Sequence, residues 1–231
     1  MKILAIESSA IAASVCVECD GKLVAEAFQN NGLTHSKTVM PMLENMLKTC
    51  GEKLDGIDKI AVAAGPGSFT GLRIGISVAK GLSWATRIPV CGVSTLEAMA
   101  YQASFFEGVI CPVMDARAGQ VYNAVFRCKD GVITRICKDR AIALSALLEE
   151  LESEEERILL LGDGAEMCYN ECKKLGIVAA LPDSAQRFPR ACGVARAARN
   201  MEGVPPEKLE IYYLRLPQAE RERLAKMKNK D

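Results

Sequence analysis

Histidine is nearly absent from this sequence, which limits the chemistry that the chain can perform. His35 is the single histidine among 231 residues. A hydrolase that pairs a serine with a histidine would have to use His35 as its base. The sequence also lacks the HExxH motif of zinc proteases and the Gly-x-Ser-x-Gly turn that presents a nucleophilic serine. Peptidase chemistry of these kinds is therefore poorly supported.

Net charge and long apolar runs are lacking as well. The 29 lysines and arginines balance 29 aspartates and glutamates, so no overall field attracts nucleic acid or a membrane surface. No apolar run reaches the roughly 18 residues that a membrane span needs. The apolar stretch at the N-terminus is too short for a secretion signal and reads as a strand. We therefore expect a cytoplasmic protein with no membrane partner.

Cysteine is abundant, but the spacing of the ten cysteines predicts neither disulfides nor a metal site. Cys16 and Cys19 lie three residues apart in a predicted strand, so their side chains point to opposite faces. Cys168 and Cys172 can share a helix face, but two thiols without a nearby histidine do not complete a zinc site. Free thiols in a reducing compartment and no bound metal are the expectation.

The apolar runs of the first half predict a unit of three strands, a helix and a fourth strand. Asp20-Gly21 between two of the strands is typical of a β-hairpin. Glu7 lies at the end of the first strand. The predicted elements are strands at 2–8, 13–19 and 22–28, a helix at about 36–50, and a strand at 59–64.

The second half repeats this plan, with Asp130-Gly131 as the hairpin turn and Asp115 at the end of the first strand. Its predicted elements are strands at 109–114, 121–128 and 132–137, a helix at about 144–156, and a strand at 158–161. Two duplicated βββαβ subdomains predict an α/β protein of the actin-like, ribonuclease-H-like (ASKHA) fold. We expect the subdomains at 1–106 and 107–215, followed by a basic tail at 216–231 that is either mobile or an arm on RNA phosphates.

A glycine-rich turn follows the predicted strand at 59–64 and leads into a predicted helix at 71–86. The segment from Gly65 to Gly75 reads GPGSFTGLRIG. Backbone N–H groups at such a strand–turn–helix junction can bind a phosphate, although glycines also serve simply to make a tight turn. With the acidic residues at the strand ends, the candidate nucleotide-binding residues are Glu7, Ser8, Gly65, Gly67, Ser68, Thr70 and Asp115.

The predicted helices at 36–50 and 71–86 carry more apolar surface than one sheet face covers. The second is apolar nearly all round, and the first is rich in methionine, which adapts to varied partners. Packing inside the chain is one explanation, and a protein partner is the other. The partner reading predicts an interface formed by Val39, Met42, Leu43, Met46, Gly71, Leu72, Gly75, Ile76 and Ala79.

Three motifs give the chain a resemblance to a known family. The segment GPGSFTGLRIG, together with IESS near the N-terminus and MDARAGQVY in the middle, resembles the TsaB family of bacterial threonylcarbamoyladenosine (t6A) biosynthesis proteins. These proteins are glycoprotease-like (M22) paralogues of the transferase TsaD. TsaD-type enzymes carry a metal-binding His-x-x-x-His pair. In this sequence His35 matches the first histidine, and Val39 stands at the position of the second. The resemblance therefore implies a pseudoenzyme with no catalytic residue and no metal.

The resemblance also implies partners. It predicts a non-catalytic scaffold that pairs with a TsaD-type transferase, works with a TsaE-type ATPase, and meets tRNA through the complex during transfer of a threonylcarbamoyl group to adenosine 37. Alone, the chain would form a homodimer. No cofactor of its own is expected, and ATP or ADP at the partner interface is a candidate ligand. The alternative is an autonomous nucleotide-binding ATPase or phosphotransferase of the actin-like fold.

Overall fold

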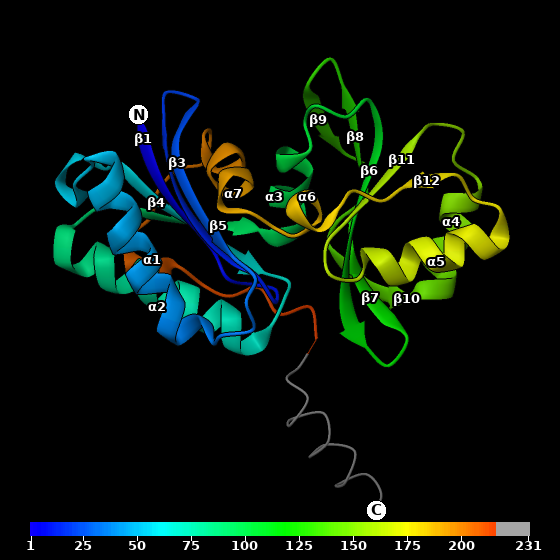
Figure 1. Ribbon diagram of the computed structural model, residues 1–231, viewed down its shortest axis with the longest axis horizontal. Coiled ribbons are helices and arrows are strands. Elements are labelled where there is room, and N and C mark those ends of the chain that lie inside the picture. Colours follow the sequence, from blue (N-terminus) through cyan, green and yellow to red (C-terminus); the bar gives the residue numbers. More distant parts are fainter. Residues whose placement is uncertain (216–231) are drawn as a thin grey trace, which may run out of the picture.

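The computed structural model describes residues 1–215, which form two lobes, each built on one β-sheet (Figure 1). The basic tail predicted at 216–231 lies outside the described residues. Within residues 1–215, no helix combines the length and the apolar character that crossing a bilayer requires.

The first lobe has a five-stranded sheet in which β1 (Lys2–Glu7) is central. β1 pairs antiparallel with β2 (Ala13–Cys19) and parallel with β4 (Lys59–Gly65). β3 (Lys22–Gln29) and β5 (Val90–Ser94) are the outer strands, so the order is β3-β2-β1-β4-β5. Alternate apolar residues of the central strands point to opposite faces, and each face therefore needs a helical layer.

Helices cover both faces of this sheet (Figure 1). α1 (His35–Cys50) and α2 (Phe69–Thr86) pack on one face in a core that includes Leu4, Ile6 and Val62. α7 (Ala191–Ala198) and α3 (Thr95–Gln102) pack on the other face against Ile3, Ala5 and other strand residues. A short 3₁₀ turn, η1 (Leu54–Gly56), joins α1 to β4.

The second lobe repeats the strand order of the first, which confirms the predicted duplication. Its path is β10-β7-β6-β11-β12, with β6 central, β7 antiparallel and β11 parallel to it. The strands are β6 (Gly108–Arg117), β7 (Gln120–Asn123), β10 (Arg140–Ala143), β11 (Ile158–Leu161) and β12 (Ala179–Ala180). The helices are α4 (Leu144–Glu152), α5 (Ala165–Leu175) and the short α6 (Ser184–Arg187).

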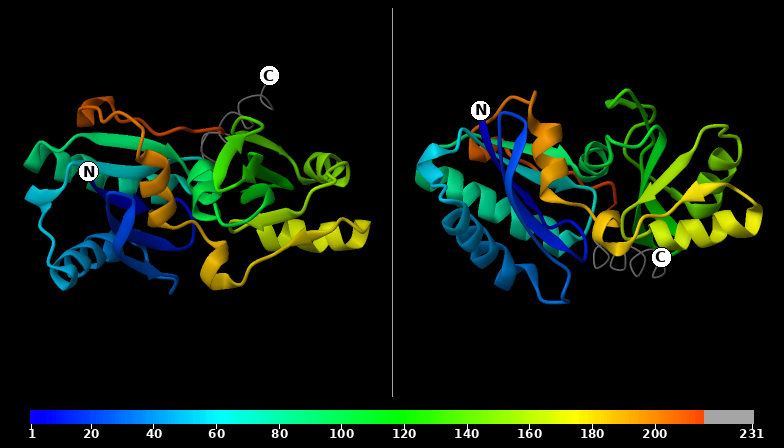
Figure 2. Two further views of the ribbon diagram at one scale, coloured as in Figure 1. Left: turned by 90° about the horizontal axis from the view of Figure 1, so that it is seen from above. Right: turned by 45° about the horizontal axis from the view of Figure 1, so that its top comes forward.

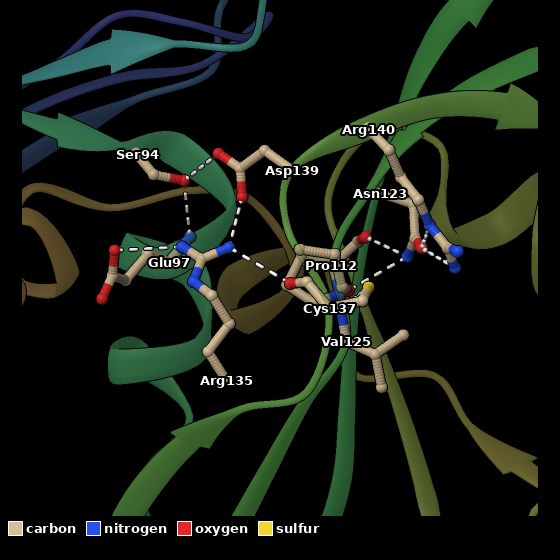
Figure 3. Close-up of polar contacts among 10 residues, drawn as sticks. Ser94, Glu97, Pro112, Asn123, Val125, Arg135, Cys137, Asp139 and Arg140 are labelled. Atoms are coloured by element: carbon tan, nitrogen blue, oxygen red, sulfur yellow. Dashed lines mark hydrogen bonds and ion pairs between the residues drawn. The ribbon is translucent and has the colours of Figure 1, made fainter.

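One predicted strand of the second unit is divided. Residues 121–128 were expected to form a single strand, but β7 ends at Asn123 and β8 (Phe126–Lys129) begins three residues later. The break lies opposite Pro112, which has no N–H to donate to a ladder. Asn123 Nδ2 donates instead to Pro112 O at 3.0 Å (Figure 3). Val125 O accepts from the Ile136 N–H at 2.8 Å.

The third strand of the second unit is also not the predicted one. Residues 132–137 were expected in that position, but β9 (Val132–Arg135) pairs with β8 and forms a side hairpin. β10 pairs with β7 and completes the repeat. The predicted hairpin at Asp130-Gly131 is confirmed, and it is an addition to the repeated unit rather than part of it.

The chain returns to the first lobe after the second sheet is complete. α7 lies against β1 and β2, although its residues fall in the range 107–215 predicted as the C-terminal subdomain. The buried ammonium of Lys59 donates to the carbonyls of Ala198 and Met201, each at 2.7 Å, and satisfies acceptors at the end of α7. The boundary at 106/107 stays a prediction, whereas α7 belongs to the first sheet.

α3 joins the lobes. Leu96 and Met99 of this helix pack with Met114 and Phe126 of the second lobe. Ser94 lies just before α3 and caps it by accepting from the Glu97 N–H at 3.2 Å. Figure 3 shows that Arg135 bridges this helix start to the second lobe, with 3.0 Å to Glu97 and 2.5 Å to Asp139.

Candidate functional site: the cleft between the lobes

A cavity of about 460 Å³ lies where the carboxyl ends of β1, β4 and β6 meet. In open α/β sheets, ligands bind at this end of the strands. Four segments form most of the cavity wall, namely the loop after β1, the glycine-rich turn, the end of β6, and a C-terminal segment. The lining residues are Ser9–Ile11, Pro66–Thr70, Met114–Arg117, Tyr122, Asp163 and Tyr212–Arg215.

The glycine-rich turn is shaped by contacts within the chain. Gly65 has a φ of +126°, and a Cβ there would lie 2.3 Å from the carbonyl oxygen of Tyr212. A Cβ on Gly71 would lie 2.1 Å from Ser8 O, and one on Gly75 would lie 2.4 Å from Ser8 Oγ. A Cβ on Gly67 would lie 2.5 Å from Ser9 O. Close approach of neighbouring chain therefore accounts for each of these glycines, and phosphate binding at the turn stays a prediction.

Ser68 and Ser8 have structural partners. Ser68 is the N-cap of α2, and its Oγ accepts from the Gly71 N–H at 3.3 Å, while Thr70 lies in the first turn. The hydroxyl of Ser8 is buried and donates to Gly71 O at 2.9 Å. These bonds fix the turn after β1 against the start of α2. The Ser8 hydroxyl therefore has a structural role, whereas Ser68 and Thr70 lie at the cavity wall.

Acidic side chains lie at the strand ends near the cleft, with Asp115 and Asp163 at the cavity wall and Glu7 buried at the end of β1. Glu7 is fully buried; its Oε1 accepts from the Ser9 N–H at 2.6 Å, and its Oε2 has no hydrogen-bond partner among residues 1–215. Burial raises the pKa of the Glu7 carboxyl to about 7, and the nearby Asp163 adds to the shift. Burial also raises the pKa of Asp163. The structure thus places the carboxyls of Glu7 and Asp163 near one another.

Asp115 lies at the cavity wall and is partly neutralised. Its backbone N–H donates to Asp163 Oδ1 at 3.3 Å, and its carboxylate forms a 3.1 Å ion pair with Arg117. Asp163 was not among the candidate residues. Its position after β11, between Gly162 and Gly164, repeats the strand-end pattern of Glu7 and was the signal available in the sequence.

The residues that correspond to a metal-binding histidine pair do not converge on a ligand site. His35 begins α1, and its Nε2 lies 2.8 Å from the carbonyl oxygen of Ala10. Val39 is 1% exposed and packs in the core of the first lobe. Residues 1–215 contain no group of three His, Cys, Asp or Glu side chains arranged to hold a metal ion. All ten cysteines are free thiols, as expected.

The predicted partner-interface residues are buried inside the chain, so this prediction is wrong for the residues named. α1 and α2 pack against the sheet and against each other, and the sheet covers more of their apolar surface than their sequences indicated. Charge at Met42 or Gly75 would therefore disturb the core rather than only block a partner. The buried residues are Val39, Met42, Leu43, Met46, Gly71, Leu72, Gly75, Ile76 and Ala79.

Other side chains form the outer surface of the two helices. On α1 the exposed residues include Met40 and Glu44. On α2 they include Arg73, Ser77 and Trp84, with the Trp84 side chain 61% exposed. These positions recur at helical spacing and so share one face. We call the exposed faces of α1 and α2 the outer helical surface.

Comparison with known proteins gives a consistent result over nearly the whole chain. The family model described as TsaD: tRNA N6-adenosine threonylcarbamoyltransferase matches residues 29–199. The "tRNA threonylcarbamoyladenosine biosynthesis protein TsaB" of Bacillus subtilis (strain 168) is 34% identical over 221 residues, covering 95% of this chain and 96% of that protein.

Two solved structures place the fold. A Pseudomonas aeruginosa protein described as similar to peptidase YEAZ superposes with a TM-score of 0.78 at 25% identity, covering 93% of this chain and 99% of that one. The activator of the 2-hydroxyisocaproyl-CoA dehydratase from Clostridium difficile, solved with bound ADPNP, superposes with a TM-score of 0.50 at 11% identity, covering 86% of this chain and 93% of that one. The latter shows the fold alone. On the match across 95% of its length, the chain belongs to the TsaB family, with the actin-like ASKHA fold.

Proposed function

We propose that this chain is a non-catalytic scaffold subunit in the t6A modification of tRNA. In this role it pairs with a TsaD-type transferase and, with a TsaE-type ATPase, supports transfer of a threonylcarbamoyl group to adenosine 37, in the cytoplasm. The observation that carries the proposal is the 34% identity to a TsaB relative over almost the full length of both chains. That relative's name assigns it to threonylcarbamoyladenosine biosynthesis.

The surroundings of His35 support the non-catalytic part of the proposal. A metal-dependent TsaD-type enzyme would need a second imidazole one helical turn after His35. Val39 occupies that position and points into the core, where an aliphatic side chain contributes packing and no metal ligand. The imidazole of His35 in turn contacts the Ala10 carbonyl and holds α1 to the loop after β1.

The outer helical surface is the surface that we propose for the transferase. It presents Met40 and Trp84 in a mainly polar setting, and large apolar side chains of this kind are typical anchors of protein interfaces. In the absence of the transferase, the same surface would pair two copies of this chain. A nucleotide bound between the subunits would be held jointly, with ATP or ADP as the candidate.

A charge placed on the outer helical surface tests this assignment. Ser77→Arg puts a long cation on the exposed face of α2 and is expected to weaken co-purification with the TsaD-type protein of the same organism at least about tenfold, because an unpaired charge is costly in an interface. Ser145→Arg is the matched control, since Ser145 is an exposed serine near the start of α4 in the other lobe. Equal binding by both variants would show that the interface lies elsewhere.

Activity is tested by omission. Threonylcarbamoyl transfer to tRNA is measured with the transferase, the ATPase and this chain, and then with each component left out. We expect transfer to fail without this chain and to return when it is added, while this chain alone gives no transfer. Transfer at an undiminished rate without it would refute the scaffold role.

The cleft supports a second candidate function, an autonomous nucleotide-binding ATPase or phosphotransferase. The supporting observation is the cavity of about 460 Å³ lined by the glycine-rich turn and by Asp115 and Asp163. Calorimetry with ATP and magnesium on the isolated chain separates the two functions. Micromolar affinity with turnover would favour the enzyme, and neither would be expected of a scaffold.

A further inference from the structure

The C-terminal part of the described chain crosses from one lobe to the other. After η2 (Pro206–Lys208), residues 209–215 run past the carboxyl ends of β4 and β5 and reach the end of β6 in the second lobe. Figure 2 shows this segment, in orange-red, running from the first lobe toward the second. We call residues 209–215 the strap.

The strap is held firmly at its first-lobe end. Leu209 is buried in the core beneath α2, and the Tyr212 N–H donates to Ala64 O at 2.8 Å. The ring of Tyr213 stacks on Phe69 with centroids 4.9 Å apart. Arg73 lies over the same Phe69 ring at 3.7 Å, and its Nε donates to the Tyr213 hydroxyl at 3.2 Å. Core packing, a backbone bond and stacking therefore fix this end to the glycine-rich turn.

The second-lobe end depends on one side chain. Arg215 Nη1 donates to Ala116 O at 2.5 Å and to Arg117 O at 3.3 Å. Among the hydrogen bonds of the described chain, these are the ones that tie the strap to the second lobe. Both bonds are charge-assisted, and the guanidinium presents its donors in a fixed geometry.

The turn that Arg215 contacts has an uncommon backbone. Arg117, Ala118 and Gly119 all have positive φ, at 66°, 55° and 69°. Two of them are not glycine, and the left-handed conformation costs such residues about 1 kcal/mol or more each. The carbonyls of Ala116 and Arg117 at the start of this turn meet the guanidinium, so the contact stabilises a conformation that is unfavourable by itself.

We propose that the strap is a latch between the lobes and that Arg215 is its release point. With the Arg215 bonds formed, the strap covers one side of the cleft and fixes the separation of the glycine-rich turn from the end of β6. When these bonds break, the firmly anchored end stays on the first lobe, and the second lobe is free to move on the side opposite α3. The latch thereby controls access to the cleft, whatever the cleft binds.

Hydrogen–deuterium exchange on the full chain tests the latch. In Arg215→Ala we expect amide hydrogen exchange to rise roughly tenfold in three segments at once. This is the size of effect expected when a charge-assisted hydrogen bond at a half-exposed site is lost. These segments are the glycine-rich turn at 65–70, the β6–β7 turn at 116–119, and the strap at 209–214. Exchange in α1 and α4, which are remote from the strap, should stay unchanged.

Arg117→Ala is the matched control. Arg117 lies in the same turn and its side chain is 80% exposed, but it pairs with Asp115 and makes no side-chain bond to the strap. The control is expected to leave the three segments as in the wild type. The latch is overturned if Arg215→Ala changes nothing, if its effect is confined to 116–119, or if Arg117→Ala gives the same increase.

Discussion

Replacing Gly71 with alanine is expected to lower the free energy of unfolding by about 3 kcal/mol. The added Cβ would lie 2.1 Å from the backbone carbonyl oxygen of Ser8, so either α2 or the turn after β1 must move. That movement would also disturb the bond from Ser8 Oγ to Gly71 O, which is buried. The measurement is chemical denaturation followed by far-UV circular dichroism.

Gly81→Ala is the control on the same helix. Gly81 is exposed, and a Cβ there meets no atom within 4 Å. Alanine has the higher helix propensity, so this variant is expected to gain about 0.5 to 1 kcal/mol. The two substitutions are chemically identical and should have opposite signs. If both proteins gained stability, the close approach of Ser8 to α2 would be wrong.

Replacing Glu7 with glutamine is expected to raise the free energy of unfolding by about 2 kcal/mol at pH 8. Burial raises the pKa of Glu7 to about 7 in the folded chain, against 4.5 when it is unperturbed. Between these values the folded state keeps a proton that the unfolded state releases. Each pKa unit corresponds to about 1.4 kcal/mol, so the wild type loses roughly 3 kcal/mol as the pH rises from 4.5 to 7, and nothing more above it. An amide N–H without a partner offsets part of the gain.

The same change should have little effect at low pH. Below about pH 4.5 the Glu7 carboxyl is protonated in the folded and in the unfolded chain. The substitution then exchanges a neutral carboxylic acid for a neutral amide. Unfolding by denaturant at pH 4.5 and pH 8 gives the two values. Asp163, whose pKa is also raised, is present in both proteins and cancels in the comparison. A variant less stable than the wild type at pH 8 would show that the carboxylate of Glu7 is stabilised in the fold.

The repeated strand pattern was predictable because it depends on local order. Alternating apolar residues set the strands of the first sheet, and Asp-Gly pairs mark the hairpins. The break between β7 and β8 was not predictable in this way. It depends on which residue of β6 lies opposite, and Pro112 is more than ten positions away along the chain.

The predicted partner-interface residues proved to be buried for a related reason. The sequence of α2 shows two apolar stripes, but it does not show how much of each stripe a neighbouring helix will cover. α1 lies beside α2, and both helices share one core with the sheet. Apolar content alone therefore overestimated the surface left for a partner.

The strap was missed because its contacts are distant in sequence. Tyr212 meets Ala64, and Arg215 meets Ala116, and no local pattern marks either pair. The glycine at position 65 was a partial signal, since an interior glycine at a strand end indicates that another backbone comes close. The structure places the carbonyl oxygen of Tyr212 where a Cβ on Gly65 would lie.

The placement of α7 has a consequence for how the protein is made. This helix covers one face of the first sheet, yet it is translated after the whole of the second lobe. A growing chain that has emerged only as far as β5 leaves Ile3, Ala5 and Val93 without their helical cover. The first lobe therefore cannot bury this face completely until α7 has been synthesised. We expect the two lobes to complete their folding together rather than one after the other.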